Sequence, residues 1–166
     1  MTAEKGSGEK LIASNPNARA NFFIEEVVEA GIALTGTEVK SLRSQAANLK
    51  DSFVEVTSTA SKESKGKLEA WLLNVHIAPY AHGNIWNHEP NRRRKLLLHR
   101  HQLEKMYGAV SQKGISIVPT RMYFKKGLAK VELGLGKGKK KYDKREDVKK
   151  RSAEREMDIA RKQRNR

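Results

Sequence analysis

The residues best suited to phosphate chemistry are the glycines and lysines of residues 134–140, GLGKGKK. A Walker-type phosphate-binding loop requires a glycine five residues before the glycine of its Gly-Lys pair, and a Ser or Thr after the lysine. Counted from Gly138, Leu133 stands where the loop requires its first glycine. Lys140 stands where the loop requires Ser or Thr. A dinucleotide-binding fingerprint is also excluded, because no βαβ pattern surrounds the glycines. We therefore interpret the segment as a flexible exit from a last strand into a basic tail.

The five histidines are the residues that could bind a metal, since the chain contains no cysteine. His99 and His101 are two residues apart, which would place them on different faces of a helix. His82 and His88 lie in a loop-like stretch with Glu89 as the nearby carboxylate. The sequence shows no Ser/His/Asp grouping and no acidic cluster. We therefore expect no metal site, no catalytic site, no cofactor and no enzymatic activity, with the imidazoles at the surface or facing RNA.

The chain carries 34 Lys and Arg residues against 19 Asp and Glu residues, a formal net charge of +15. A surplus of this size is typical of a protein that binds a polyanion, because each neutralised phosphate releases counterions. The alternative is a basic surface that only keeps the protein soluble. One cluster directly precedes three leucines and is a candidate RNA-facing patch, with a solvated face as the alternative. Its members are Arg92, Arg93, Arg94 and Lys95.

Residues 137–166 contain 14 basic and 6 acidic residues, which gives this segment a net charge of +8. Opposite charges at helical i,i+4 spacing pair Glu146 with Lys150, Asp147 with Arg151 and Asp158 with Lys162. Only a thin apolar stripe accompanies them, which is too little to pack on a core. We predict a tail that is disordered when free and becomes helical on a charged partner such as RNA. A disordered solubilising tail is the alternative.

Most aromatic and branched aliphatic residues lie within residues 15–136, where short strands dominate. In residues 22–30 apolar residues alternate with glutamates, which is the period of a half-buried strand. Residues 115–124 and 128–133 flank a three-residue loop that ends in glycine, a hairpin signal. In the second of these strands Lys130 must point away from the apolar face.

Two helices are expected between the strands. Residues 35–38, TGTE, fit a capping box at the start of the first helix. The second helix is expected over residues 96–110, where Leu103, Tyr107 and Val110 keep helical spacing. Several short strands with two helices in a small chain predict a mainly β fold with flanking helices. The best match is a closed β-barrel of the oligonucleotide-binding (OB) type.

These features divide the chain into three parts. We expect a flexible N-terminal arm at residues 1–14, the barrel domain at residues 15–136 and the basic tail at residues 137–166. The arm lacks the apolar region and cleavage site of a secretory signal. No apolar run approaches the roughly 20 residues that span a bilayer. We therefore expect a cytoplasmic, monomeric protein without a membrane partner.

Four long stretches resemble the SsrA-binding protein family in order and spacing: GTEVKSLR (36–43), HIAPYAHGNIWNHEPNRRRKLLL (76–98), YFKKGLAKVELGLGKGKKKYDKR (123–145) and EDVKKRSAERE (146–156). The resemblance implies an OB-type barrel that binds the tRNA-like domain of tmRNA. It also implies delivery of alanyl-tmRNA, with elongation factor Tu, to stalled 70S ribosomes for ribosome rescue and peptide tagging. The tail would become helical in the empty mRNA channel, near the decoding centre and small-subunit rRNA. A structural ribosomal or rRNA-binding protein is the alternative function.

The resemblance also implies roles for individual residues of the barrel. Asn15, Glu29, Leu97 and Lys130 correspond to family positions associated with tmRNA binding. For Lys130 the strand alternation agrees with this role, because it turns the side chain outward. Glu29 would either accept hydrogen bonds from base or ribose donors or orient a basic neighbour. Leu97 could equally be a packing residue.

In the tail, the resemblance assigns a set of residues to the ribosome and its decoding centre: Lys139, Lys140, Tyr142, Asp143, Lys144 and Arg145. The last three match a family motif required for tagging after tmRNA has bound. Tyr142 stands where some relatives have histidine, and either ring could stack on a nucleobase. The chain departs from the family pattern at Pro16, Asn17 and Ala20, which leaves the RNA contact of the N-terminal region open.

Overall fold

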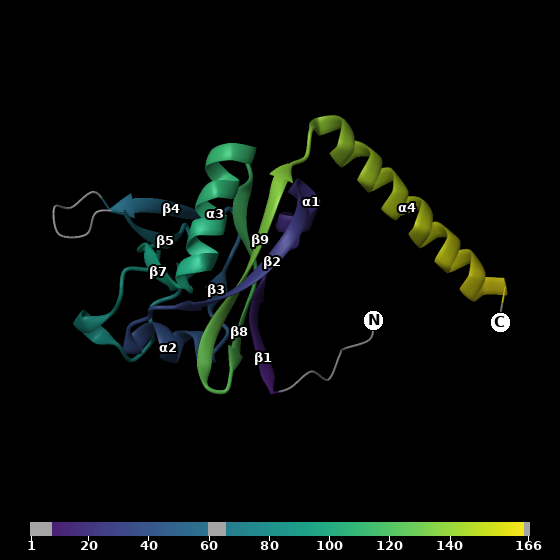
Figure 1. The fold of residues 1–166 in the computed structure, drawn as a ribbon. Helices are drawn as coiled ribbons and strands as arrows, with labels where there is room; N and C mark the ends of the chain where they lie inside the picture. Colours follow the sequence, from purple (N-terminus) through teal and green to yellow (C-terminus); the bar gives the residue numbers. More distant parts are fainter. Residues whose placement is uncertain (1–7, 60–65, 165–166) are drawn as a thin grey trace.

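The computed structural model describes residues 8–59 and 66–164 of the chain (Figure 1). The strands are β1 (Glu9–Ser14), β2 (Phe22–Ile32), β3 (Ala47–Asn48), β4 (Phe53–Thr59), β5 (Lys67–Leu73), β6 (His76–Ile77), β7 (Arg94–Leu97), β8 (Ser116–Lys125) and β9 (Leu128–Gly138). The helices are α1 (Pro16–Asn21), α2 (Gly36–Arg43), α3 (Arg100–Lys113) and α4 (Lys141–Arg164), with a 3₁₀ turn η1 (Asn84–Trp86).

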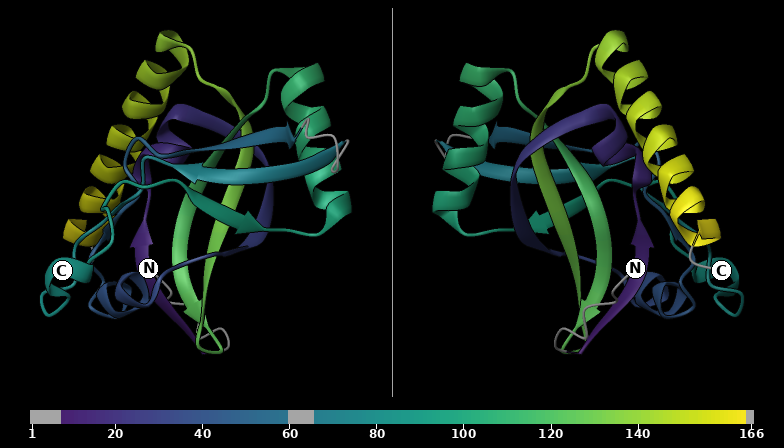
Figure 2. Two further views of the ribbon diagram at one scale, coloured as in Figure 1. Left: turned by 90° about the vertical axis from the view of Figure 1, so that its left-hand side faces the viewer. Right: turned by 90° about the vertical axis from the view of Figure 1, so that its right-hand side faces the viewer.

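Seven of the strands form one antiparallel sheet in the order β1-β8-β9-β2-β7-β5-β4. The sheet curls until β4, at one edge, contacts β8, which lies next to the other edge (Figure 2). The short strands β3 and β6 pair with each other in a second sheet. The prediction of a mainly β, barrel-type fold with flanking helices is confirmed.

Apolar side chains from alternate strand positions fill the barrel. Along β9, Val131 and Leu133 are fully buried, while Lys130 points to the other face as the alternation predicted. Helix α3 packs against β4 and β5 and buries Met106 completely. Each such side chain contributes roughly 1.5–3 kcal/mol through its burial. The core therefore depends on the pairing of strands that are distant in the sequence.

Residues 134–138 belong to β9, so the predicted flexible exit into the tail is wrong. They pair with the first half of β2. A side chain at Gly136 would overlap the carbonyl oxygen of Phe23, and one at Gly134 would come within 2.8 Å of Ile24 Cδ1. These glycines therefore let two long strands approach closely where their register shifts at a bulge.

Residues 9–14 also differ from expectation. They form β1 rather than part of a flexible arm, pair with β8 and bury Ile12. Residues 1–7 of the expected arm lie outside the described part of the chain. The pairing partner of this edge strand is more than a hundred residues away in the sequence, so the local composition did not reveal it.

The second helix starts later than predicted. Residues 94–97 form β7, which pairs with β2 and β5, and α3 begins at Arg100. A run of leucines is compatible with either a helix or a buried strand. Here the hydrogen-bonded pairing with β2 and β5 makes it a strand. The loop between β8 and β9 has two residues rather than three, Lys126 and Gly127, both with positive φ.

The tail forms one helix, α4, which projects from the barrel (Figure 1). Its contacts with the barrel lie at its beginning, next to α1. Residues 148–163 are all exposed. This part depends on its own backbone hydrogen bonds, and an isolated helix is marginally stable in water. The predicted helical spacing agrees with α4, and disorder of the free tail in solution stays a prediction.

Candidate nucleic-acid interface

Three residues that the sequence linked to RNA line one groove on the barrel. Glu29 of β2, Leu97 of β7 and Lys130 of β9 border a groove of about 670 Å³. The other lining residues come from the same strands, from β5 and from the start of α3: Gly31, Lys67, Leu68, Glu69, Lys95, Leu96, Leu98, His99, Gln102 and Leu103. Because β7, β2 and β9 are neighbours in the sheet, side chains far apart in the sequence meet here.

Gly31 connects Leu97 and Lys130 across the sheet. It is the register partner of Leu97 on β7 and of Lys130 on β9. A Cβ atom at Gly31 would lie 3.1 Å from the Cβ of Leu97. Leu97 is 57% exposed, so it is a surface residue of the groove and not a core residue.

Glu29 is held by a tyrosine and two lysines. The Tyr123 hydroxyl donates to Glu29 Oε2 at 2.5 Å, and Lys125 Nζ donates to the same oxygen at 3.1 Å. Lys130 Nζ lies 3.8 Å from the other oxygen. The bond from Tyr123, followed by that from Lys125, lowers the pKa of Glu29 below its usual 4.5. An ionised Glu29 therefore orients basic neighbours, which is one of the two roles that the sequence left open.

The same cluster fixes the protonation of Tyr123. Burial of the ring, and then the Glu29 carboxylate, raise the pKa of Tyr123 above its usual 10. The hydroxyl therefore keeps its proton and acts as a donor to Glu29 at neutral pH. Arg121 stacks over the same ring, with its guanidinium carbon 5.0 Å from the ring centre.

Asn15 lies apart from the groove, between β1 and α1. It is 8% exposed, and its Nδ2 donates to the Pro119 carbonyl at 3.0 Å. Its backbone N–H donates to the Thr120 carbonyl at 2.7 Å. Its Oδ1 is buried without a hydrogen-bond partner among the described residues. Asn15 therefore holds the junction between β1 and α1 against β8. It also borders a cavity of about 340 Å³ that Arg19 and Arg121 line.

The basic residues at 92–95 do not form one RNA-facing patch. Arg94 is fully buried, with its Nε donating to Glu38 Oε1 at 2.8 Å and its Nη1 donating to the Val75 carbonyl at 2.7 Å. Arg92 Nη2 donates to Glu38 Oε2 at 2.6 Å. The prediction that Arg94 faces RNA is wrong, because a buried carboxylate and backbone carbonyls satisfy its guanidinium.

Glu38 is fully buried. Burial by itself would raise its pKa, but hydrogen bonds from Arg92 and from the Thr35 N–H, with the charge of Arg94, hold that pKa below 4.5. Burial lowers the pKa of Arg94 from its usual 12.5, and Glu38 opposes this shift. The bond from Thr35 N to Glu38 Oε2, 2.8 Å long, is the reciprocal contact of the predicted capping box. One carboxylate thus caps α2 and ties it to β7.

Arg93 and Lys95 lie at the surface around Trp71 of β5. The Arg93 guanidinium carbon is 4.7 Å from the centre of the Trp71 ring, and Lys95 Nζ is 5.8 Å from it. Lys95 also pairs with Glu69 at 2.6 Å and lines the groove. Of the predicted patch, these two cations remain candidates for RNA contact.

Among the five histidines, His88 is structural, whereas His76, His82, His99 and His101 are exposed. His88 is 8% exposed, with Nδ1 3.0 Å from Thr37 Oγ1 and Nε2 3.1 Å from the Ile77 carbonyl, so it is not a surface imidazole. The rings of His99 and His101 stack with centres 5.8 Å apart, because His99 precedes the helix. Within residues 8–59 and 66–164, no group of three or more His, Asp or Glu residues could hold a metal ion. The described helices include none that is long and apolar enough to cross a membrane.

Lys139 ties the start of the tail to the barrel. Its backbone N–H donates to the Asn21 carbonyl at 2.7 Å, and its Nζ donates to the Arg19 carbonyl at 3.0 Å. The same Nζ donates to Asp147 Oδ2 at 2.5 Å and lies 4.7 Å from the centre of the Phe23 ring. This ion pair lowers the pKa of Asp147 below 3.8. Lys139 is 8% exposed at its side chain, so in this conformation it is not presented to a ribosome.

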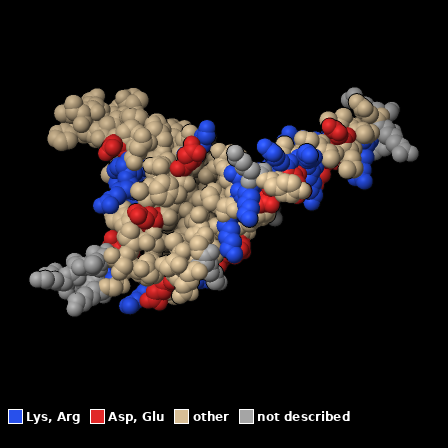
Figure 3. Space-filling model, turned by 90° about the horizontal axis from the view of Figure 1, so that it is seen from above, with Lys and Arg blue, Asp and Glu red and all other residues tan. Residues whose placement is uncertain are grey.

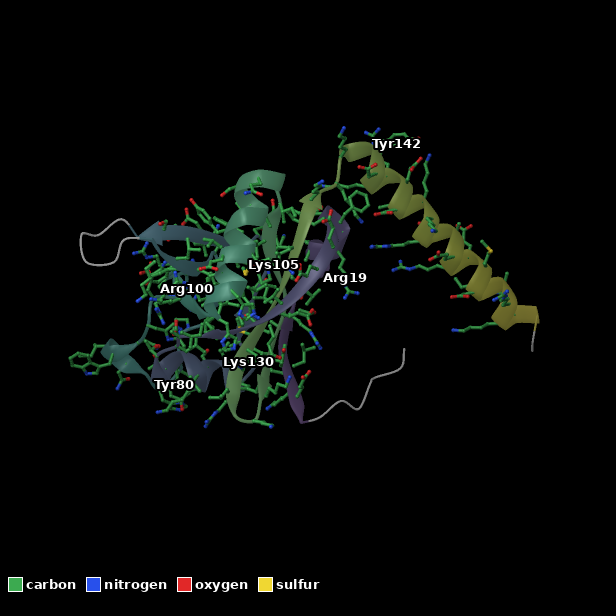
Figure 4. All side chains as sticks on the ribbon, viewed as in Figure 1. Arg19, Tyr80, Arg100, Lys105, Lys130 and Tyr142 are labelled. Atoms are coloured by element: carbon green, nitrogen blue, oxygen red, sulfur yellow. The ribbon has the colours of Figure 1, made fainter. Side chains whose placement is uncertain are left out.

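The other predicted tail residues separate into two kinds. Asp143 Oδ2 accepts from the Lys140 N–H at 3.0 Å, which places a carboxylate at the third position of α4 in the manner of a capping box. Tyr142 is 70% exposed and Arg145 is exposed, while Lys144 lines a cavity next to Lys139. Figure 4 shows Tyr142 at the start of α4, at the opposite end of the molecule from Tyr80. Basic side chains with interspersed acidic ones follow α4 away from the barrel (Figure 3).

Comparison with known proteins places this arrangement in a family. The family model described as SmpB protein matches residues 12–163, which includes the barrel and nearly all of α4. The chain belongs to the SmpB family.

Curated SmpB-family relatives carry the name SsrA-binding protein. One from Pelobacter propionicus is 55% identical over 96% of this chain and 99% of its own length. One from Geobacter sulfurreducens is 57% identical over 90% of this chain and 92% of its own. A solved chain from a structure described as "tmRNA-SmpB: a journey to the center of the bacterial ribosome" is 44% identical. It covers 82% of this chain and 93% of its own, with a TM-score of 0.61.

Within this SmpB-family barrel, sequence reasoning missed Tyr123 and Lys125 as partners of Glu29. A signal for them was available, since alternation along β8 turns both to one face. What the sequence lacked was the register that sets Tyr123 opposite Lys130. The departures at Pro16 and Asn17 fall in the first turn of α1, where proline is well suited to the first position.

Proposed function

We propose that this protein binds the tRNA-like domain of tmRNA and acts in trans-translation on stalled ribosomes, as an adaptor without enzymatic activity. The names of its SmpB-family relatives and of the similar solved structure support the RNA and the ribosome as partners. The observation that carries the proposal is the groove that joins Glu29, Leu97 and Lys130.

The groove has the chemistry for a structured RNA. Lys130 and Lys95 would supply donors to phosphate oxygens, and the exposed Leu97 would contact ribose or a base edge. Glu29 Oε2 accepts from Tyr123 and Lys125, and Oε1 faces Lys130, so Glu29 acts by holding these two lysines in place. Folded RNA is recognised mainly through shape, phosphates and 2′-hydroxyls, which suits a groove of fixed cations.

The buried Asn15 would take a different part. Its unpaired Oδ1 costs the free protein about 1–3 kcal/mol if nothing satisfies it. A 2′-hydroxyl or a base amino group that reached this corner would supply the missing donor. We expect this contact to require a small movement of α1, because the atom itself is buried.

The tail would serve the ribosome. Tyr142, Lys144 and Arg145 start an exposed basic helix that would enter the empty mRNA channel near the decoding centre and contact small-subunit rRNA. Lys139 would join them only after its pair with Asp147 opens. Lys140 would remain at the junction, where its N–H is capped by Asp143. Elongation factor Tu in the delivery complex, a monomeric state and a cytoplasmic location complete the proposal.

The test is to purify the protein with its bound RNA and to sequence that RNA. We expect tmRNA to be enriched, and purified tmRNA to bind more tightly than elongator tRNA in a titration at fixed salt. Retention on ribosomal subunits through a high-salt wash without tmRNA enrichment would instead indicate a structural ribosomal protein. Turnover of the bound RNA would contradict the adaptor role.

A further inference from the structure

A loop on the barrel presents two large apolar side chains to solvent. Ile85 and Trp86 of η1 are 87% and 83% exposed. Full burial of such a side chain would stabilise the protein by roughly 1.5–3 kcal/mol, and these two exposed side chains contribute little of that free energy. The groove and the tail do not include these residues.

The exposure does not come from a loose loop. Asn87 clamps its base, since Tyr80 N–H donates to Asn87 Oδ1 at 3.0 Å and Asn87 Nδ2 donates to the Tyr80 carbonyl at 2.7 Å. His88 anchors the next position in the interior, with Nε2 3.1 Å from the Ile77 carbonyl. A side chain at Gly83 would come within 2.7 Å of the Asn87 amide and would push that amide out of its present position. The loop is thus preorganised to hold Trp86 outward, which lowers the entropy cost of binding.

The surroundings of the loop are basic. Lys40 Nζ lies 5.4 Å from the centre of the Tyr80 ring at the loop base, and Arg43 follows one turn later on α2. Both are exposed. In residues 76–90, Glu89 is the sole carboxylate. An exposed aromatic ring on a loop whose base carries an exposed lysine matches a base that stacks on the ring while its phosphates contact nearby cations.

The position of the loop separates it from the groove. In Figure 2 the end of β7 and the start of α3, which line the groove, lie on one side of the barrel, and η1 lies on the other. The far end of α4 lies at the opposite end of the molecule from η1 (Figure 1). An RNA that occupies the groove therefore leaves Trp86 uncovered, on a part of the surface that belongs to neither the groove nor the tail.

We propose that Trp86 is a docking residue for an unpaired base of ribosomal RNA, with Ile85 beside it and Lys40 and Arg43 on the adjoining phosphates. This inference rests on the proposed function, because it assumes that the groove holds tmRNA and that the protein acts on the ribosome. A base in a regular duplex cannot reach the ring, so the site selects a base that is unpaired and unstacked.

The test compares the full-length protein with Trp86→Ala and Trp86→Phe, and with Leu128→Ala as a control at another exposed apolar residue. Binding is measured to purified tmRNA alone and, with tmRNA present, to 70S ribosomes stalled on a message without a stop codon. We expect Trp86→Ala to leave tmRNA affinity unchanged and to weaken ribosome binding roughly 5- to 100-fold. Phenylalanine should restore most of the loss, and the control should bind normally.

A photo-crosslinking benzoylphenylalanine at position 86 identifies the partner. A crosslink to ribosomal RNA supports the proposal, whereas one to tmRNA or to a ribosomal protein overturns it. Unchanged ribosome binding by Trp86→Ala also overturns it, while the function proposed above survives. If the unaltered protein fails to bind stalled ribosomes with tmRNA, the proposed function itself fails, and the control variant will show the same result.

Discussion

The barrel and the tail helix use their charges in opposite ways. On the barrel, cations are held in fixed pairs, as in Lys125 with Glu29, Arg121 with Glu132 and Lys95 with Glu69. Along α4, residues 148–163 are exposed, and the ion pair of the helix in the described part of the chain joins Asp147 to Lys139, which bonds to the barrel side at the Arg19 carbonyl. The body therefore offers a surface of fixed shape, and the tail offers charge that can adapt.

This difference suggests two modes of RNA recognition in one chain. A fixed array of cations distinguishes RNAs by the spacing of their phosphates. A mobile or newly folding basic helix gains most of its affinity from counterion release and depends less on shape. We expect substitutions in the two regions to have separable effects.

The largest expected effect concerns the rigidity of the barrel. Glu38→Ala should lower the free energy of unfolding by about 3–5 kcal/mol, because it leaves Arg94 buried without its partner. Urea denaturation followed by tryptophan fluorescence measures this. Glu55→Ala, at an exposed strand position, is the control and should change stability by less than about 0.5 kcal/mol. Equal midpoints for the two variants would contradict the role of Glu38.

The same carboxylate predicts a dependence on pH. The pKa of Glu38 is lowered in the folded protein, so its stabilisation is fully present above the unfolded pKa of about 4.3 and is lost as the pH falls through the folded value. Thermal unfolding between pH 7 and pH 3 should therefore show a loss of stability on acidification. The loss should be smaller in Glu38→Gln, which has no carboxylate to protonate.

Changes in the tail should affect peptide tagging without affecting tmRNA binding. The combined change of Asp143, Lys144 and Arg145 to alanine should stop peptide tagging, while tmRNA affinity stays close to that of the unaltered protein. A reconstituted tagging reaction and a tmRNA titration measure the two quantities. A large loss of tmRNA affinity would show that the tail belongs to the tmRNA site, and the division proposed here would be wrong.

Substitutions in the groove should have the opposite effect to those in the tail, because they should weaken tmRNA binding itself. Lys130→Ala should weaken tmRNA binding and reduce the salt slope of log K by about 1, as expected for the loss of one phosphate contact. Lys126→Ala is the matched control, because Lys126 is an exposed lysine at the hairpin turn outside the groove. If the two variants keep the same slope, Lys130 makes no phosphate contact.

The smallest effect separates two roles of Asp143. A capping contact to the Lys140 N–H can be replaced by glutamine but not by alanine, whereas a contact that needs negative charge cannot be replaced by either. We therefore expect Asp143→Ala to reduce the helical circular dichroism of the tail by a small amount, and Asp143→Gln to preserve both helicity and tagging. Loss of tagging in Asp143→Gln with helicity intact would indicate a direct ionic contact.

Much of the local structure followed from sequence patterns. The alternation over 128–133 turned Lys130 outward, and TGTE at residues 35–38 marked the start of α2. The i,i+4 pairs after residue 140 agree with α4. These features depend on neighbours within a few residues, which the sequence displays directly.

Several site assignments could not follow from such patterns. Arg94 stands in a run of four basic residues, and nothing local shows that its guanidinium meets a carboxylate 56 positions away. Lys139 likewise reads as an exposed tail residue, although Asp147 and the Arg19 carbonyl hold it. Burial of a charge depends on a partner, and partners across the sheet are set by strand order.

The sequence by itself determined the basic character of this protein, its family resemblance and the periodicity of its strands and tail. Tertiary structure decided which cations face solvent and which residues share the groove. Residues 29, 97 and 130 meet because β7, β2 and β9 are adjacent. Adjacency of strands is a global property, in which each pairing is stabilised by the core that all the others form together.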